Sequence, residues 1–504
     1  MGFSNAAAAA CGIILPPLTV SPRVRLPLLL TALLATGVLL AWLPLSVAVL
    51  LVGGPLAGFV VLRYPQFLLY FLLVLIPFSP WFTIPLAGAR VGLMELTLFA
   101  ALAAALLRFS TRPRPETKPG PPPILLWPFL LFLAAVSLSW LNTLSLAASL
   151  VETVKWVEML VLYWLVVTLV PRRHVKWLVA VILLTGMAQA GLGLYQFLFK
   201  VGPPGFLLFG GRFLRAYGSF AQPNPYAGYL GLILPLALAV GLWTVSTAWS
   251  AASKKYSWGR IMLGGAPLLI LLTALFASQS RSGWLGFMAA AVVVLLLYSR
   301  RTALLVVGSG LLLTGLLLVG AFNLGVSQLD NSYGAVMQRL AQAVDIFSIT
   351  NVTAIEVTDA NFSTVERLAH WQAAREMWRD NPWLGVGFGN YAVVYPAYAP
   401  GRWLDPLGHA HNYLLNLGAE TGLVGITGYL IFWIFIFGVI WQAVRHTNGF
   451  NRAVAVAAAG VAVHLHVHNL FDNLYVQGMY LHVAFFLGVV SLLWAGGSWR
   501  GNTR

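Results

Sequence analysis

The stretch with the clearest chemical potential is residues 409–425, HAHNYLLNLGAETGLVG, which follows a long polar segment and leads into an apolar run. It contains two histidines, His409 and His411. A neutral imidazole near its free pKa can take a proton from a hydroxyl group. We expect His411 to start a helix at the outer surface of the membrane that the chain spans, where it could serve as a general base. The alternative is a histidine that only bonds to the backbone at the start of that helix.

Three arginines are predicted to share the same outer surface. Arg281 lies in a short polar step between two apolar segments, and Arg212 and Arg215 precede another apolar segment. A guanidinium donates hydrogen bonds in pairs and suits a phosphate or diphosphate. These arginines therefore indicate an anion site. The alternative is that they reach up to the interface and contact lipid headgroups.

The most polar part of the chain is the connection of residues 322–410, and a connection this long is rarely without function. Within it, residues 364–380, TVERLAHWQAAREMWRD, are expected to form a helix. Arg367 and Arg375 lie eight residues apart, within one sector of that helix. Both are candidate substrate-binding residues.

A second histidine-rich stretch contains His464, His466 and His468. On a helix His464 and His468 are four residues apart and could share a metal ion. The HExxH pattern is absent, and the nearest carboxylate is Asp472. We therefore predict a polar helix end near the outer surface and no metal site.

The elements that position these residues must be membrane helices. Hydrophobic residues make up 59% of the 504 residues and charged residues only 9%, against roughly 25% charged residues in soluble domains. Long apolar runs span the bilayer as helices, because lipid offers the backbone no hydrogen-bond partners. The sequence predicts an all-α polytopic membrane protein with about 12–14 transmembrane helices and one large extracytoplasmic loop. The apolar segments cover residues 26–42, 45–62, 66–79, 92–107, 123–140, 146–169, 177–198, 225–247, 262–279, 283–298, 302–321, 423–443, 453–470 and 478–496.

Basic residues determine the predicted orientation. They gather in alternate connections, which the positive-inside rule assigns to the cytoplasm. Both termini are then cytoplasmic, and the connections 199–224 and 322–410 lie outside. The net charge of +16 is explained by these connections, so no nucleic-acid partner is expected. The basic positions are Arg23, Arg25, Arg63, the linker 108–118, RRHVK at 172–176, Lys254, Lys255, Arg260, Arg300, Arg301, Arg445, Arg452, Arg500 and Arg504.

Four regions of a single membrane domain follow from this topology. Residues 1–198 are N-terminal transmembrane helices, and residues 199–321 are central helices with a basic outer loop. The large extracytoplasmic loop covers 322–410, and C-terminal helices cover 411–504. The single cysteine, Cys11, excludes an internal disulfide and a multi-thiolate metal site.

Five motifs, in order along the chain, resemble those of O-antigen ligases and the related O-antigen polymerases. They are GSFAQPNPYAGYL at 218–230, SQSRSGWLG at 278–286, PWLGVGFGNY at 382–391, His411-Asn412 followed after nine residues by GLVG, and HNLFDN at 468–473. The first 190 residues match only as generic membrane helices. One departure is Gln222, where the family often has asparagine.

The resemblance implies a C-type glycosyltransferase fold and an enzyme at the outer face of the bacterial cytoplasmic membrane. Such an enzyme moves a glycan from an undecaprenyl-diphosphate donor to an acceptor. The acceptor is lipid A–core sugar for a ligase, the end of another repeat unit for a polymerase, or a protein side chain. The resemblance implies no cofactor and no metal ion, and the partners are the lipid-linked donor, the acceptor and membrane lipids.

The resemblance also implies roles for individual residues. His411 matches the proposed base, and Arg281 and Arg215 match arginines that would hold the diphosphate and neutralise charge as the sugar–phosphate bond breaks. The candidate substrate-binding residues are Arg212, His409, Asn224, Asn412, Arg367 and Arg375.

Several functions stay open. Ligase and polymerase share the motifs, and the spacing from His411 to the glycines slightly favours the ligase. Acceptor choice is expected to lie around residues 323–362. The alternatives are a protein O-oligosaccharyltransferase of the same superfamily, a transporter or flippase of lipid-linked sugars, and a non-catalytic assembly subunit.

Overall fold

The computed structural model describes residues 58–86, 89–111, 123–208, 211–249, 257–323, 351–358 and 361–498, together with isolated positions before residue 55. The chain divides into two compact units, Met1–Tyr64 and Pro65–Arg504. In the first unit the longest described stretch is 58–64, so the predicted segments 26–42 and 45–62 lie mostly outside the described residues. Cys11 also lies outside them, as does most of the proposed acceptor-selecting region 323–362.

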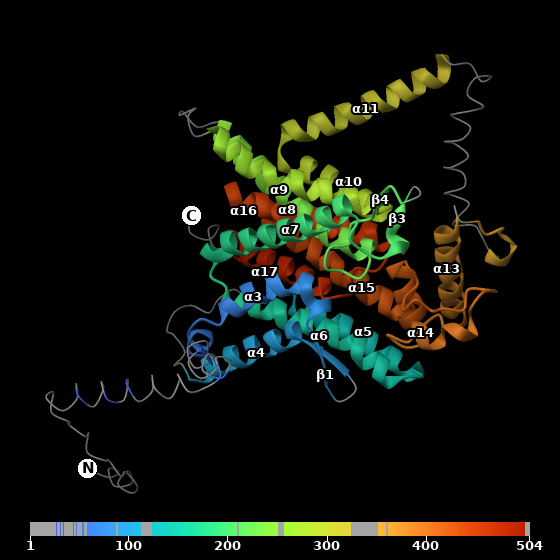
Figure 1. Ribbon diagram of the computed structural model, residues 1–504, viewed down its shortest axis with the longest axis horizontal. Coiled ribbons are helices and arrows are strands. Elements are labelled where there is room, and N and C mark those ends of the chain that lie inside the picture. Colours follow the sequence, from blue (N-terminus) through green and yellow to red (C-terminus); the bar gives the residue numbers. More distant parts are fainter. Residues whose placement is uncertain are drawn as a thin grey trace, which may run out of the picture. The chain divides into compact units, whose positions relative to one another are not determined.

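The second unit is built from helices (Figure 1). Its N-terminal helices are α3 (Gln66–Leu75), α4 (Leu93–Thr111), α5 (Leu126–Leu138), α6 (Leu146–Leu169) and α7 (Val175–Phe199). The central helices are α8 (Pro223–Trp249), α9 (Ser257–Ser278), α10 (Arg281–Tyr298) and α11 (Arg300–Asn323). The C-terminal helices are α15 (Tyr413–His446), α16 (Gly449–Asn469) and α17 (Met479–Ser498). Each predicted apolar segment from 66–79 onwards therefore corresponds to a helix.

Short elements connect these helices. Two antiparallel strand pairs form, β1 (Thr83–Leu86) with β2 (Ala89–Gly92) and β3 (Leu207–Leu208) with β4 (Phe213–Leu214). Thr83 pairs with Gly92, and Leu207 pairs with Leu214. The 3-10 turns are η1 (Ile76–Trp81), η2 (Ser139–Asn142), η3 (Arg172–His174), η4 (Pro204–Phe206), η6 (Val352–Ala354) and η7 (Tyr395–Ala397).

Seven helices in the described residues are long and apolar enough to cross a membrane. They are Leu93–Thr111, Arg172–Phe199, Pro223–Ala248, Trp258–Ser278, Arg281–Tyr298, Tyr413–His446 and Gly449–Asn469. Shorter apolar helices cover Gln66–Trp81, Leu126–Asn142 and Met479–Ala495. The chain is a multi-pass, all-α membrane protein, as predicted.

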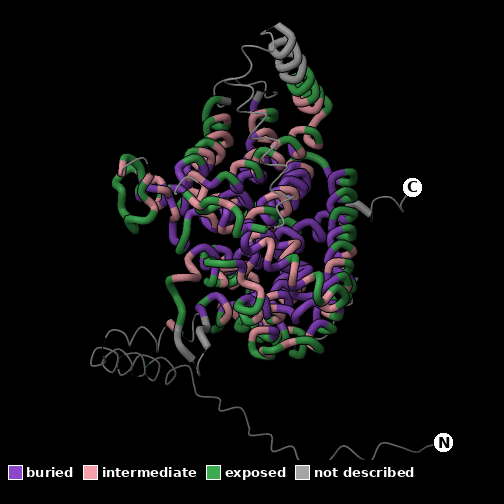
Figure 2. Tube along the Cα trace, turned by 90° about the vertical axis from the view of Figure 1, so that its right-hand side faces the viewer, coloured by how far each residue is buried: buried purple, intermediate pink, exposed green. Residues whose placement is uncertain are grey.

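Small residues let the central helices pack closely. α8, α10 and α16 contact one another, and α17 packs against α6. A Cβ atom at Gly231 of α8 or Gly286 of α10 would overlap the His464 ring of α16. Gly460 of α16 likewise faces Val294 and Pro235. Close approach through glycine is the usual way in which membrane helices gain packing contacts, and Figure 2 shows the buried residues gathered in the interior of the bundle.

Two arginines mark one end of the bundle. Arg172 donates to the carbonyls of Leu492 and Leu493 in α17, both at 2.6 Å. Arg452 donates to the carbonyls of Tyr298 and Leu297 at the end of α10, at 2.5 and 2.8 Å. The starts of α7 and α16 thus lie at the end of the bundle where α10 and α17 finish. The opposite end carries the starts of α8, α10, α15 and α17 and the end of α16.

A separate small core lies at that opposite end. It is built around α13 (Phe362–Asp380), which packs against α15, and α14 (Tyr391–Val394). α13 covers the helix predicted at 364–380 and begins two residues earlier, after the cap position Asn361. Ala373, Met377, Tyr391 and Tyr395 are buried together in this core. Because this core holds α13 against α15, the side chains on the opposite face of α13 have fixed positions.

Candidate functional site

The turn before α15 holds His409 and His411 in fixed positions. Asn412 is the N-cap residue, and its Oδ1 accepts a hydrogen bond from the Leu415 N–H at 3.1 Å. The Ala410 N–H donates to Asn416 Oδ1 at 3.0 Å. His411 has a φ of +51°, a left-handed conformation that few residues other than glycine adopt. This backbone turns both imidazoles towards the end of α16.

Asp472 faces these two histidines from the turn after α16. Its Oδ1 lies 3.6 Å from His411 Nδ1 and 3.9 Å from His409 Nε2. The turn is held by its own side chains, since Asn469 Oδ1 accepts from the Leu474 N–H and Asn473 Oδ1 from the Tyr475 N–H, both at 2.8 Å. The Asp472 side chain is 8% exposed. Residues from two distant helix ends thus form one His–Asp cluster.

The protonation of this cluster follows from its surroundings. Burial lowers the pKa of His409 to about 4, with a further contribution from His411. For Asp472, burial alone raises the pKa, but the adjacent His411, His409 and His468 together hold it well below its usual range. At neutral pH, His409 is therefore an uncharged ring beside an ionised carboxylate.

The same three residues, His409, His411 and Asp472, are those most suited to hold a metal ion in the described part of the chain, because their ligand atoms lie within 4.8 Å of one another. His409 argues against such a role. Its Nδ1 accepts a hydrogen bond from the His411 N–H at 3.1 Å, so the neutral ring carries its hydrogen on Nε2. Nε2 faces Asp472 and could ligate a metal only after giving up this hydrogen. The neutral ring would then carry its hydrogen on Nδ1, and the hydrogen bond from the His411 N–H would be lost.

Arg215 lies in the loop between β4 and α8 and is held by several acceptors. Its Nε donates to the Ser278 carbonyl at 3.0 Å, and a terminal nitrogen donates to Asn224 Oδ1 at 3.0 Å. Burial, together with the charges of Arg367 and Arg281, lowers its pKa to about 10. Arg215 therefore stays charged at neutral pH, with a fixed orientation.

Two further arginines reach the same space. Arg281 is the first residue of α10, after the N-cap Ser280. Arg367 projects from α13, and burial lowers its pKa, with Asp472 acting in the opposite direction. Three guanidinium groups from three segments line this space, and the charge of Arg281 lowers the pKa of both Arg215 and Arg367. This arrangement suits a multiply charged anion such as a diphosphate.

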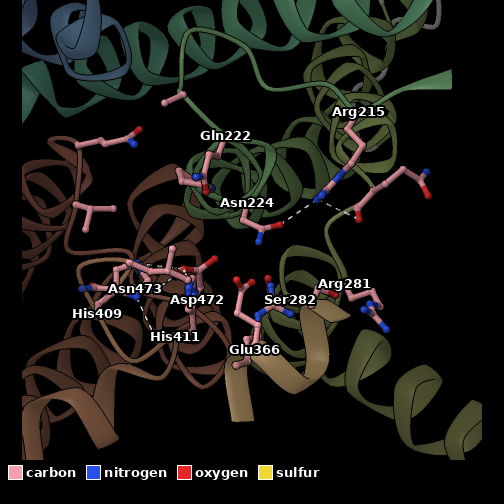
Figure 3. A pocket seen from close by; sticks show the side chains of 18 residues that line it. Arg215, Gln222, Asn224, Arg281, Ser282, Glu366, His409, His411, Asp472 and Asn473 are labelled. Atoms are coloured by element: carbon pink, nitrogen blue, oxygen red, sulfur yellow. Dashed lines mark hydrogen bonds and ion pairs between the residues drawn. The ribbon is translucent and has the colours of Figure 1, made fainter. Parts of the chain in front are cut away.

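One cavity of about 460 Å³ joins the arginines and the His–Asp cluster. Figure 3 shows His409, His411, Asp472 and Asn473 on one side and Arg215 and Arg281 on the other, with Asn224, Ser282 and Glu366 between them. The cavity is lined by Arg215, Ala221, Gln222, Asn224, Pro225, Gln279, Arg281, Ser282, Ser363, Glu366, Arg367, Leu407, His409, His411, Asp472, Asn473, Val476 and Gln477. Its chemistry combines an anion site with a proton acceptor.

A comparison with protein families matches residues 266–430 to the family described as O-antigen ligase. The matched segment covers about a third of the chain and is what this protein shares with that family. The predicted resemblance to the O-antigen ligase and polymerase superfamily is thereby confirmed, and at a coarse level it supports a role in surface polysaccharide assembly. No curated protein matches the chain.

The O-antigen ligase segment covers only part of the cavity. Arg281, Arg367, His409 and His411 lie within residues 266–430. Arg215 and Asn224 precede the segment, and Asp472 follows it. The fold therefore completes a cavity to which both the family segment and its flanking helices contribute.

Three predicted site residues lie outside the cavity. Arg212 is exposed, with its guanidinium carbon 5.6 Å from the Phe213 ring centre. Arg375 is exposed on α13. The side chain of Asn412 is occupied as the helix cap. The predicted residues that the structure brings together are Arg215, Asn224, Arg281, Arg367, His409 and His411.

Asp472 and Glu366 line the cavity but were absent from the predicted site. Asp472 is the acidic residue of the HNLFDN motif, which was the available signal. Glu366 precedes Arg367 on α13, and burial raises the pKa of its carboxyl group. Nothing in the sequence separated Glu366 from an ordinary helix-start carboxylate.

The glycine-rich motif WLGVGFGN docks the segment that contains α13 onto the bundle. The Gly387 N–H donates to the Glu420 carbonyl at 2.9 Å, and Asn390 Oδ1 accepts from the Ser145 N–H at 2.8 Å. Gly422 interrupts α15 with a φ of +60°, and a Cβ there would overlap the backbone of Trp383. The glycines at both places allow two backbones to touch. This contact places α13 above the start of α15.

Proposed function

We propose that this protein transfers a glycan from undecaprenyl diphosphate to an acceptor hydroxyl at the outer face of the bacterial cytoplasmic membrane, with both termini in the cytoplasm. The observation that carries the proposal is the single cavity with three arginines facing a His–Asp cluster. The predicted topology puts this end of the bundle outside. The family match favours the O-antigen ligase among the related activities.

In the proposed reaction, His411 acts as the base through Nε2. Its Nδ1 faces Asp472 at 3.6 Å, so the hydrogen of the neutral ring belongs on Nδ1. Nε2 takes the proton of the acceptor hydroxyl as the oxygen attacks the anomeric carbon of the donor sugar. The ionised Asp472 stabilises the imidazolium that forms.

The arginines act on the leaving group. As the bond between the anomeric carbon and the phosphate oxygen breaks, the diphosphate keeps the electron pair. Arg215 and Arg281 neutralise the charge that develops there, and Arg367 adds a third cation. Because a diphosphate is a good leaving group, fixed positions and charge stabilisation supply the catalysis without a metal ion.

An apolar groove beside the cavity fits the prenyl chain of this donor. It has a volume of about 210 Å³ and shares Arg281, Ser282 and Arg367 with the cavity. The rest of its lining is mainly apolar and comes from α10, α13 and the turn after α16: Leu285, Thr364, Leu368, Trp371 and Phe471. A lipid diphosphate has this combination of a charged head and an apolar tail.

Reconstitution with an undecaprenyl-diphosphate oligosaccharide tests the proposal. Transfer only after lipid A–core is added identifies a ligase, a ladder of lipid-linked chains a polymerase, and transfer to protein an oligosaccharyltransferase. Asp472→Asn should lower the transfer rate at least about tenfold, because the imidazolium loses its counter-ion. Movement of the lipid between leaflets without any transfer would contradict the proposal.

A further inference from the structure

Backbone strain in this protein concentrates at the cavity. In the described residues, the non-glycine residues with positive φ are Lys200, Gln279, Leu407, His411 and Gln477. All of them except Lys200 line the cavity. Such conformations are unfavourable for most residues and persist where the surrounding structure enforces them. His411 has a proposed role, whereas Gln477 has none so far.

Gln477 occupies a turn that would suit other residues better. The Met479 N–H donates to the Val476 carbonyl at 3.0 Å, and the two residues between them, Gln477 and Gly478, have φ of +50° and +76°. Positive φ at both central positions is the pattern of a type I′ turn, which favours asparagine and glycine. The chain has glycine at 478 but glutamine at 477. A distant segment of the chain holds the turn in place, because Ser79 Oγ donates a hydrogen bond to the Gln477 carbonyl at 3.2 Å.

The side-chain amide of Gln477 adds a second cost. Its Oε1 is buried without a hydrogen-bond partner, and in the described part of the chain no hydrogen bond is formed by its amide nitrogen. Three other amides of the cavity form hydrogen bonds within the protein. Asn224 accepts from Arg215, Asn473 accepts from Tyr475, and Gln279 donates to the Phe276 carbonyl. A buried polar group without a partner requires an explanation, and for Gln477 the adjoining cavity offers one.

We propose that Gln477 is a specificity-determining residue that binds the sugar ring attached to the diphosphate. This inference rests on the proposed function. The diphosphate itself does not fit, because a carboxamide oxygen repels an anion and the arginines already face it. The prenyl chain does not fit, because an amide beside it would lose hydrogen bonds. Sugar hydroxyl and acetamido groups pair with a carboxamide as donors and acceptors.

The position of the cavity residues supports this assignment. The ring whose anomeric bond breaks must lie between the arginines and His411. Gln477 lines the same cavity, on the turn that follows Asp472 and Asn473. A hydrogen bond between the Gln477 amide and that ring would give the amide a partner and explain why glutamine occupies a strained turn.

Two variants separate binding from folding. Gln477→Gly removes the amide and relieves the backbone strain, and Gln477→Asn keeps an amide that is one methylene shorter in a turn that favours it. Both should keep or raise the melting temperature. The matched control is Gln66→Ala, because Gln66 also has a buried Oε1 without a partner but lies on α3, outside the cavity.

The experiment measures the affinity of protein in nanodiscs for undecaprenyl diphosphate and for the same lipid carrying one N-acetylhexosamine. Gln477→Gly and Gln477→Asn should weaken binding of the sugar-bearing lipid by about tenfold, the scale of one hydrogen bond, and leave binding of the bare lipid unchanged. Gln66→Ala should change neither, and Arg281→Ala should weaken both.

Three outcomes would overturn the inference. If Gln477→Gly binds both lipids as the wild type does, Gln477 does not bind the sugar, and the proposed function is unaffected. If it loses affinity for both lipids equally, its role is structural. If the wild type binds neither lipid, the proposed function fails together with the inference.

Discussion

The two histidine-rich stretches of this protein differ in their backbone, and that difference separates their roles. His409 and His411 lie in a turn, where the positive φ of His411 directs both rings to Asp472. His464 and His466 have the same spacing on helix α16, so their rings point to different neighbours. His464 fits against Gly231 and Gly286, while the His466 ring centre lies 4.4 Å from that of Trp433. Equal spacing therefore gives a shared site in a turn and separate packing contacts on a helix.

The largest expected effect tests the catalytic side of this comparison. His411→Ala should lower glycan transfer by about 100-fold or more, because the acceptor hydroxyl loses its base, while donor binding persists. His411→Asn serves as a second variant, since asparagine tolerates a positive φ. Initial transfer rates and donor affinity are the measurements. His466→Ala is the control and should keep most of the activity, and equal losses in both positions would remove the distinction.

The next effect tests the packing side. Gly286→Val should lower the free energy of unfolding by about 1–3 kcal/mol, because the new side chain overlaps the His464 ring. Adding His464→Ala makes room and should recover part of that loss. Thermal unfolding of the single and double variants measures this coupling. Strictly additive losses would mean that the two residues do not compete for the same space.

The pH dependence of stability sharpens the comparison further. The pKa of His409 is about 4 in the folded protein and about 6.5 when unfolded, so between these values the unfolded chain binds the extra proton. Stability should therefore fall as the pH drops from 6.5 towards 4, by about 1.4 kcal/mol per pH unit at most. His409→Gln should show a shallower fall in melting temperature between pH 7 and 5. An identical slope would show that His409 is not held neutral.

The smallest expected effect concerns metal ions. EDTA should leave the transfer rate unchanged, since His409 carries its hydrogen on the nitrogen that faces Asp472. The assay is initial transfer rate before and after chelation. A loss that added zinc reverses would instead make His409, His411 and Asp472 metal ligands.

The sequence was enough to predict the helices, because long apolar runs have few other stable forms in a membrane. It was also enough to single out Arg215, Arg281 and His411, which lie at interruptions of those runs. It could not separate Arg367 from Arg375, since both lie in one sector of α13 although eight residues place them about 12 Å apart along its axis.

The sequence did not assign Asp472 to the site, for a different reason. Its partners His409 and His411 belong to another helix end, and only the packing of α15 beside α16 brings them together. Arg212 and Arg215 likewise differ because β4 lies between them and pairs with β3. Short pairings of this kind leave no periodic pattern in the sequence.

The docking of the WLGVGFGN motif against Gly422 and α6 has a practical consequence for chimaeras. Exchanging the whole connection between α11 and α15 with that of another protein would separate Gly387 from Glu420 and Asn390 from Ser145, which are bonded in this protein. A productive junction should instead fall before Asn361, so that α13 and the motif stay with the helices that receive them. The expectation that residues 323–362 select the acceptor could then be tested without displacing the histidines.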